Sequence, residues 1–199
     1  MSWSLQAGST CPGSIDPVSK EVLPVCSGCY AKAGCYNFKN TKATREHNRV
    51  DWKRAEWVDD MVRLLAKQKY FRWFDSGDLY HPALAFKIYL IMTKTPHVKH
   101  WLPTKCFNIP KIRAVLDRMK LLDNVSVRFS APGIDGSYTD KHGSVVIPYY
   151  DDATEATVCG AYTRAGKCGD CRACWDKSVK VIAYPAHGRK MKKMVRVNN

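Results

Sequence analysis

The sequence predicts an α/β protein, with a partial barrel or open sheet of mainly parallel strands between irregular, cysteine-bearing N- and C-terminal segments. Strand-like and helix-like stretches alternate through the middle of the chain, and the helix-like stretches are long enough to connect parallel strands. Cysteines gather near the two ends. We expect a single domain over 1–199, made of an irregular segment 1–48, an α/β core 49–150 and a C-terminal cysteine segment 151–199.

Apolar side chains at helical spacing mark the expected helices. One helix is expected to begin at about Val50, since Trp57, Met61 and Leu65 recur on one face. Two more are expected to open with Pro82 and Pro110, because proline suits the first turn of a helix.

The stretches "KYFRWFDSGD", "HVKHWLPT" and "NVSVRFSAPG" predict three strands, and "SVVIP" and "VIAYPAH" add further candidates. Strands joined through helices run parallel, and ligands of such sheets bind at the carboxyl ends of the strands. Those ends read "FDSGD", "LPTKC" and "FSAPG", which are rich in polar residues, glycine and proline. We therefore expect a site where these three segments meet.

Composition limits the partners and the compartment. The formal net charge of +14 and the basic stretches 39–54 and 188–197 make DNA or RNA a candidate partner, although a solvated helix face and a basic tail would look the same. No apolar run approaches the roughly 20 residues that cross a membrane. The first residues lack the basic start and apolar core of a signal peptide, so we expect a cytoplasmic protein.

Grouped cysteines in a reducing cytoplasm indicate metal or cluster ligands. The run "CGDCRAC" places Cys168, Cys171 and Cys174 at three-residue intervals, as in the loops of bacterial ferredoxins that hold a [4Fe–4S] cluster. Cys159 is the natural fourth ligand. Zinc is the alternative metal, although its sites more often show two separated pairs. The isolated Cys106 is predicted to be a buried small hydrophobe.

The N-terminal cysteines are Cys11, Cys26, Cys29 and Cys35. They contain one C-x-x-C pair with two outlying members, and no strand leads into this pair as in a redox dithiol. A second cluster or a zinc site fits better. If only three of the four bind a cluster, one iron keeps an open position that can bind a small molecule.

A further set of polar residues surrounds the end of the first predicted core strand. Arg72, Asp75, Asp78 and His81 are candidates for acid–base chemistry or cation binding there. The alternative is structural: Asp78 would cap the following helix and pair with Arg72.

Several long motifs resemble the phage and prophage family called gene product 88. They are "SWSLQAG", "TCPGS", "CSGCYAKAG", "FRWFDSGDLYHP", "HWLPTK", "VRFSAPG" and "KCGDCRACWDKSVKVIAYPAHGRK". The resemblance implies a phage or prophage origin, hence action in the host cytoplasm. It also implies that cysteines recur at Cys11, Cys26 and Cys29 and at all four C-terminal positions, whereas Cys35 need not be cysteine, which favours the three-thiolate arrangement.

A looser likeness connects the sequence to radical S-adenosylmethionine enzymes, which join a three-cysteine cluster to a partial barrel. The likeness implies S-adenosylmethionine as a candidate cofactor, with Ser76 and Gly77 of "DSGD" in the position of a glycine-rich binding loop; the usual cysteine spacing is absent. The leading interpretation is an iron–sulfur protein with one or two [4Fe–4S] clusters and redox or radical chemistry at the strand ends. The alternative is a non-enzymatic nucleic-acid-binding protein with structural zinc or iron–sulfur sites.

Overall fold

Two parallel sheets form the framework of the chain, in a computed structural model that describes residues 1–150 and 155–197. The larger sheet has the order β1-β2-β3-β4 and the smaller has the order β5-β7-β6, with every pairing parallel. The strands are β1 Ser2–Trp3, β2 Tyr70–Trp73, β3 Lys99–Thr104, β4 Val125–Phe129, β5 Ser144–Ile147, β6 Thr157–Val158 and β7 Ile182–Pro185. The predicted α/β class with an open parallel sheet is thereby confirmed. Residues 151–154 and 198–199 of the predicted C-terminal segment lie outside the described residues.

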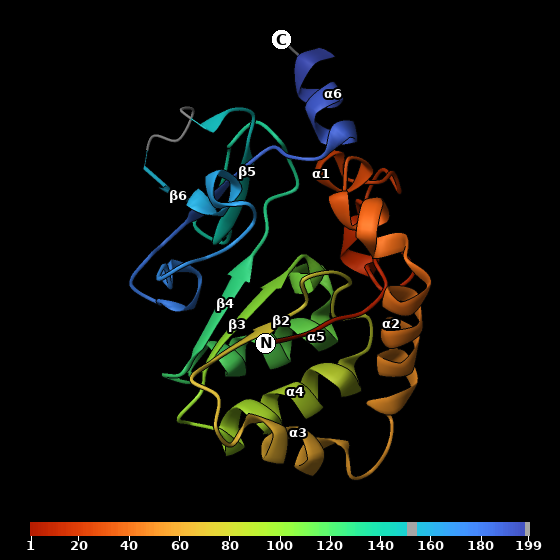
Figure 1. Cartoon of the computed structure of the whole chain (residues 1–199), viewed down its shortest axis with the longest axis vertical. Helices are drawn as coiled ribbons and strands as arrows, with labels where there is room; N and C mark the ends of the chain where they lie inside the picture. The colour runs from red at the N-terminus through yellow and green to blue at the C-terminus, as the bar shows by residue number, and fades with distance from the viewer. Residues whose placement is uncertain (151–154, 198–199) are drawn as a thin grey trace.

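Three helices cover one side of the larger sheet, as Figure 1 shows for α3, α4 and α5. The α-helices are α1 Pro24–Ser27, α2 Lys39–Asp51, α3 Trp57–Leu65, α4 Pro82–Lys94, α5 Pro110–Lys120 and α6 Arg189–Val197. Helix α4 connects β2 to β3 and α5 connects β3 to β4, and both open with proline as predicted. These connections return the chain to the same edge each time, so the strand ends meet in one place.

The side of the larger sheet that faces these helices is apolar. Phe71, Trp73 and Leu102 from the strands pack with Leu84 and Ile88 from α4, and all five are almost fully buried. Each such side chain contributes about 1.5–3 kcal/mol relative to exposure. This layer is the main core of the fold.

The opposite side of the sheet carries polar and aromatic side chains. Arg72, Trp101 and Ser126 stand in register on neighbouring strands, so they share one face. The C-terminal segment covers that face: the Trp175 ring packs on Trp101 at 5.1 Å between centroids, and its Nε1 donates to the carbonyl of Phe71 at 2.9 Å. The face that the helices leave open is therefore closed by the cysteine-bearing C-terminal segment.

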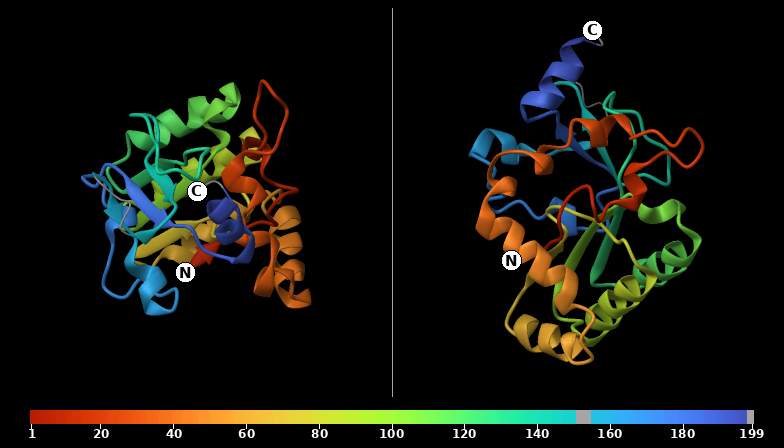
Figure 2. Two further views of the ribbon diagram at one scale, coloured as in Figure 1. Left: turned by 90° about the horizontal axis from the view of Figure 1, so that it is seen from above. Right: turned by 90° about the vertical axis from the view of Figure 1, so that its right-hand side faces the viewer.

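The smaller sheet continues from the end of β4. An isolated parallel bridge joins Ser130 to Ser144, and the Ala131 amide donates to the Ser144 carbonyl at 2.8 Å. Figure 2 shows the smaller sheet and α6 beyond the carboxyl ends of the larger sheet. The strands β5 and β7 correspond to the predicted stretches "SVVIP" and "VIAYPAH".

The prediction that residues 1–48 are irregular is wrong at both ends of that segment. Residues Ser2–Trp3 form β1, and Lys39–Asp51 form the helix α2. Strand β1 is too short to show alternation. Helix α2 has no apolar stripe, since its single buried residue is Arg45, so hydrophobic periodicity could not reveal it.

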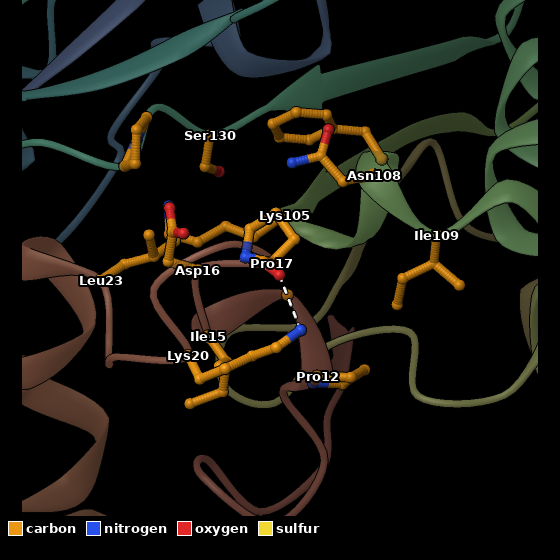
Figure 3. A pocket seen from close by; sticks show the side chains of 13 residues that line it. Pro12, Ile15, Asp16, Pro17, Lys20, Leu23, Lys105, Asn108, Ile109 and Ser130 are labelled. Carbon is orange, nitrogen blue, oxygen red and sulfur yellow. Dashed lines mark hydrogen bonds between the residues drawn. The ribbon is translucent and has the colours of Figure 1, made fainter.

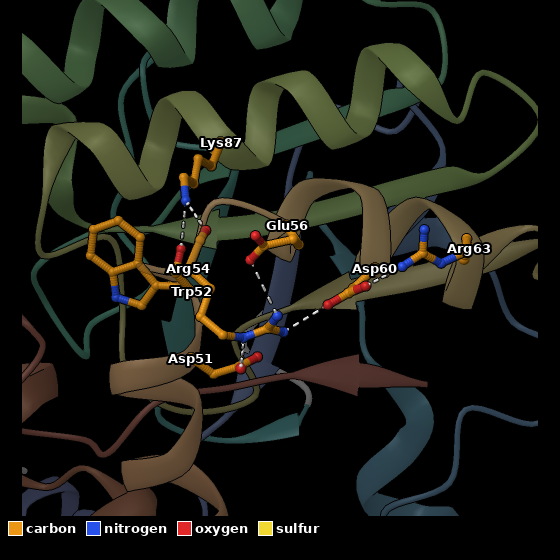
Figure 4. A network of polar contacts seen from close by, with 7 residues as sticks. All are labelled: Asp51, Trp52, Arg54, Glu56, Asp60, Arg63 and Lys87. Atoms are coloured by element: carbon orange, nitrogen blue, oxygen red, sulfur yellow. Dashed lines mark hydrogen bonds and ion pairs between the residues drawn. The ribbon is translucent and has the colours of Figure 1, made fainter.

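The helix expected from Val50 begins at Trp57, as α3, and a polar turn separates it from the preceding helix α2. Helix α2 ends at Asp51 and α3 begins at Trp57. In this turn Arg54 Nε donates to Asp51 at 2.6 Å, and Lys87 Nζ of α4 donates to the Trp52 carbonyl at 3.0 Å (Figure 4). The turn thus ties α2 and α3 to α4.

Candidate metal centre

Asp78 joins the loops that follow β2 and β3. Its Oδ1 accepts hydrogen bonds from Thr104 Oγ1 and the Leu79 amide, both at 2.7 Å, and its Oδ2 accepts one from the Lys105 amide at 2.8 Å. Burial raises the pKa of this carboxyl, although the three hydrogen bonds act in the opposite direction. Asp78 therefore fixes the two strand ends against each other.

Lys105 extends this connection to the end of β4. Its Nζ donates to the carbonyl of Ala131 at 3.0 Å. Burial lowers the pKa of the Lys105 ammonium, while Cys26, Asp78, Cys29 and Cys11 act to raise it. A partly buried ammonium therefore stands within electrostatic range of three cysteines, at the point where the three predicted strand ends meet.

Cys11, Cys26 and Cys29, here called the cysteine trio, come from separate turns of the N-terminal segment. Cys11 precedes the short helix η1 (Pro12–Ser14), Cys26 lies in α1, and Cys29 precedes η2 (Tyr30–Lys32). All three are partly buried free thiols.

The members of the trio act on one another electrostatically. Burial, followed by the charge of Asp78, raises the pKa of Cys11 to about 12, and Cys26 and Cys29 add to the increase. Burial also raises the pKa of Cys26, while Lys105 opposes that increase. The three thiols therefore lie within electrostatic range of one another, and the ammonium groups of Lys105 and Lys32 both offset negative charge on Cys26.

The remaining cysteines of this half of the chain lie elsewhere. Cys35 is exposed, in the helix η3 (Gly34–Asn37), and its role as a ligand stays a prediction. Cys106 is fully buried in the main core, as predicted for a small hydrophobe.

A cavity of about 280 Å³ opens beside Lys105 (Figure 3). Its walls are the N-terminal loop, with Pro12 and Lys20, and the segments after β3 and β4, with Lys105 and Ser130. Gly13 makes this contact close, because a Cβ at that position would lie 2.5 Å from the Lys105 carbonyl carbon. The loop that carries Cys11 is therefore packed directly on the backbone that follows β3.

The C-terminal cysteine segment is held by Arg128 of β4. Its guanidinium donates to the carbonyls of Ala173, Cys174, Asp176 and Val179 at 2.7–3.0 Å. Burial lowers the pKa of Arg128, with Tyr184, Cys174 and Asp176 acting in the opposite direction. A single buried side chain thus shapes the turn around Cys174.

The four C-terminal cysteines are brought together only in part. Cys159 and Cys174 pack in one cluster with Trp101 and Ile182, and Cys174 Sγ lies 3.3 Å from the Tyr184 hydroxyl. Burial raises the pKa of Cys174 to about 11 and that of Tyr184 well above its usual value. Cys168 and Cys171 are exposed.

The four residues predicted for acid–base chemistry point to different surroundings. The Arg72 guanidinium stacks on Trp101 at 4.5 Å, and Asp75 lies 3.6 Å from Arg45. Asp78 belongs to the Lys105 site described above. His81, and not Asp78, caps α4, since its Nδ1 accepts from the Ala83 amide at 3.1 Å.

Ser76 and Gly77 support the N-terminal segment. The Ser76 hydroxyl donates to the Leu5 carbonyl at 2.7 Å. Gly77 has a φ of +73°, and a Cβ there would lie 2.6 Å from Leu5 Cβ, so glycine is needed for both reasons. Their predicted role in binding a cofactor stays a prediction.

Sequence reasoning did not single out Lys105 and Arg128. Both are basic residues in a chain with 32 lysines and arginines, so neither stands out by type. Arg128 alone offered a hint, because a charged residue within "VSVRF" is unusual unless that side of the strand is covered by polar partners.

A single metal ion needs several donor atoms close to one point. Within residues 1–150 and 155–197, no group of three or more His, Cys, Asp or Glu side chains is arranged to hold a metal ion. In a cluster each cysteine binds a different iron, so the sulfurs surround a volume instead of meeting at one point. The cysteine trio supplies three thiols within electrostatic range of Lys105, and a cluster at this place stays a prediction.

The two basic stretches differ in how much charge they expose. In the first, Arg45 is buried and Arg49 pairs with Glu46. In α6 the basic residues are exposed, namely Arg189, Lys190, Lys192, Lys193 and Arg196. Met191 and Met194 of α6 pack over Gly28, between Cys26 and Cys29. The described helices include none long and apolar enough to span a bilayer.

Comparison with known proteins gives one family. The family model described as Gene product 88 matches residues 1–177, a span that contains every cysteine. No curated protein and no solved structure matches the chain. The match lends no support to the radical S-adenosylmethionine likeness, which stays a prediction.

Proposed function

The chain belongs to the phage gene product 88 family, and within that family we propose an iron–sulfur protein whose principal cluster is held by Cys11, Cys26 and Cys29. The proposed activity is redox or radical chemistry on a ligand in the crevice at the carboxyl ends of β2, β3 and β4. Its place of action is the reducing cytoplasm of the host, which keeps thiols available for metal.

One observation carries this proposal: three partly buried thiols from separate turns lie within electrostatic range of the Lys105 ammonium. Burying thiols together is unfavourable for their ionised forms, as the raised pKa of Cys11 shows. Iron ligation offsets that cost because the metal stabilises the thiolates. Lys105 adds a fixed positive charge, and Asp78 holds the backbone of Lys105 in place.

A [4Fe–4S] cluster bound here would supply electron transfer, and three protein ligands would leave one iron open to a small molecule. The cavity beside Lys105 offers space for such a molecule next to the Cys11 loop. S-adenosylmethionine is a candidate for it. Pro12 and Ile15 would shield one side of this ligand, while Lys105 and Asn108 would face it with polar groups.

The C-terminal cysteines form the proposed second site. Cys159 and Cys174 are already together, and Arg128 fixes the turn that carries Cys174. Cys168 and Cys171 are exposed, so we expect their loop to order when metal binds.

A second candidate function rests on the exposed cations of α6. Helix α6 packs on the loop of Cys26 and Cys29 through Met191 and Met194. The second candidate is a non-enzymatic nucleic-acid-binding protein in which zinc or iron–sulfur sites hold the long loops together. Cations gathered on one helix would contact phosphates of DNA or RNA.

Metal analysis of the full chain, purified without oxygen, separates the two candidates. The leading proposal predicts a brown protein that contains iron and acid-labile sulfide in equal amounts. Colourless protein with stoichiometric zinc, together with DNA or RNA binding that weakens steeply as salt rises, would select the second candidate. Both candidates would be contradicted if the purified protein contained neither iron nor zinc and took up neither metal on anaerobic reconstitution.

A further inference from the structure

Helix α6 separates its charged side chains from its apolar ones. Met191 and Val195 are buried, and they pack with Ile134 and with the partly buried Val25 of α1. The exposed side chains described in α6 are all basic. At 3.6 residues per turn they fall on the opposite side of the helix from Met191 and Val195. The apolar side of α6 is therefore used for packing, and the other side, here called the basic side of α6, faces solvent.

Carboxylates do not neutralise the basic side of α6 within the described part of the chain. Every ion pair formed there joins residues between 45 and 117, so none of them includes α6. The contact that Lys192 makes is with a neutral group, since its Nζ donates to the Tyr162 hydroxyl at 2.7 Å. Cations gathered in this way on one helix face attract a polyanion.

The Tyr162 ring lies beside these cations and is 49% exposed. Lys192 Nζ is 5.3 Å from the centre of the ring, which is close to the largest distance that its 2.7 Å contact with the hydroxyl allows. The ammonium therefore stands beyond the hydroxyl end of the ring and does not cover either face. An exposed aromatic face of this kind can stack with another flat ring.

Two further rings connect Tyr162 to the interior. His187 lies 6.3 Å from Tyr162 and 4.8 Å from Tyr30, measured between ring centres. The His187 ring is fixed by its own hydrogen bond, because its Nδ1 lies 3.0 Å from the Pro185 carbonyl, which can only accept. Tyr30 directly follows Cys29. The row of rings thus leads from the cysteine trio to Tyr162 at the surface.

We propose that the basic side of α6 and the Tyr162 ring together bind single-stranded nucleic acid. The cations contact its phosphates, and an unpaired base stacks on Tyr162. Aromatic rings beside cations hold single strands without reading their sequence, because every base has a flat face. The bases of a duplex are stacked on one another, so a duplex uses the cations alone. This inference rests on the second candidate function and does not depend on which metal the cysteines hold.

A lipid surface with anionic headgroups is the other polyanion to which basic helices bind. A helix that binds there inserts its apolar side into the lipid. In α6 that side is already buried through Met191 and Val195, so the helix would have to detach from the protein. Nucleic acid fits the described surface without such a rearrangement.

Fluorescence anisotropy of the full chain tests the proposal with a labelled oligothymidine, a labelled oligouridine and a labelled duplex of the same length. The two single strands share phosphates and base faces, so we expect both to bind more tightly than the duplex. Tyr162→Ala should weaken single-strand binding about fivefold or more, the effect of losing one stacked base, and should leave duplex binding unchanged. Tyr162→Phe keeps the ring and should bind as the unmodified chain does.

A double variant tests the cations. Lys192→Gln with Lys193→Gln should weaken the binding of all three probes and reduce its dependence on salt. Lys111→Gln with Arg118→Gln removes the same charge from exposed positions of α5 and should leave binding unchanged.

Circular dichroism must show that each variant is folded, and Tyr162→Leu, which keeps the bulk but lacks the aromatic face, replaces Tyr162→Ala if that variant unfolds. Equal affinity for the duplex and the single strands, or unchanged single-strand affinity in the folded Tyr162 variant without the ring, would overturn the inference and leave the second candidate function in place. Binding to vesicles of anionic lipid with no binding to any oligonucleotide would overturn both.

Discussion

His100 lies in a chain of buried hydrogen bonds that determines its protonation state. Trp73 Nε1 is 3.3 Å from His100 Nδ1, and an indole N–H can only donate, so Nδ1 must be the acceptor. The proton is therefore on Nε2, which donates to Thr95 Oγ1 at 2.9 Å, and Thr95 donates to the Ile91 carbonyl at 2.7 Å. Burial lowers the pKa of His100 to about 4.

This lowered pKa predicts a loss of stability in acid. The unfolded state, with an ordinary histidine pKa of about 6.5, binds more protons than the folded state between that pH and pH 4. The free energy of unfolding should therefore fall by about 3 kcal/mol from this residue as the pH drops from about 6.5 to 4. Urea unfolding across this range should show a shallower pH dependence for His100→Gln than for the unmodified chain. Exposed His47→Gln is the control, and equal slopes for all three proteins would refute the assignment.

Candidate site residues could be predicted from the sequence where the residue type or its spacing is rare. Candidates of a common residue type could not be predicted. Cysteines at three-residue spacing stand out by type alone, and Asp78 stands out because it follows a strand. Arg45 does not stand out, because an arginine within a basic stretch is expected to be exposed on the surface. Its burial is visible only once α2 is placed against β1.

At the scale of elements, Arg128 connects the larger sheet to the C-terminal cysteine segment. We expect Arg128→Met to destabilise the fold by at least about 3 kcal/mol, because several buried carbonyls lose their donor together. Arg128→Lys should recover only part of the loss, since an ammonium cannot bond so many carbonyls at once. Chemical denaturation measures both variants. An effect below about 1 kcal/mol for Arg128→Met would show that the turn around Cys174 does not depend on this residue.

The elements of the core could be predicted because their sequence patterns agree with their burial. Helices α4 and α5 open with proline and carry an apolar face that is buried. In β4 the sequence alternates, but Ser126 and Arg128 are buried as well because the C-terminal segment covers their side of the sheet. The element at the edge of the larger sheet could not be predicted in this way. Strand β1 has only Ser2 and Trp3, and it forms because Trp3 packs on Trp57 and Trp73, far along the chain.

At the scale of the whole molecule, the parallel topology places the site. The ends of β2, β3 and β4 meet, as the alternation of strands and helices predicts, and the N-terminal loops pack over them (Figure 1). Sequence spacing favoured the C-terminal cysteines as the clearer cluster motif. Our proposal gives the N-terminal cysteine trio the principal cluster, because the fold brings Cys11 within electrostatic range of Cys26 and Cys29, which sequence spacing alone does not indicate.

The most direct test measures iron and sulfide in a chain whose Cys168 and Cys171 are already serine, so that the N-terminal site alone is measured. After anaerobic reconstitution, Cys11→Ser, Cys26→Ser and Cys29→Ser should each lose most of the bound iron and the visible absorption. Cys35→Ser, the matched control in the same segment, should retain both. A Cys35→Ser protein as depleted as the Cys26→Ser protein, or full iron content in all four variants, would contradict the assignment of the cysteine trio.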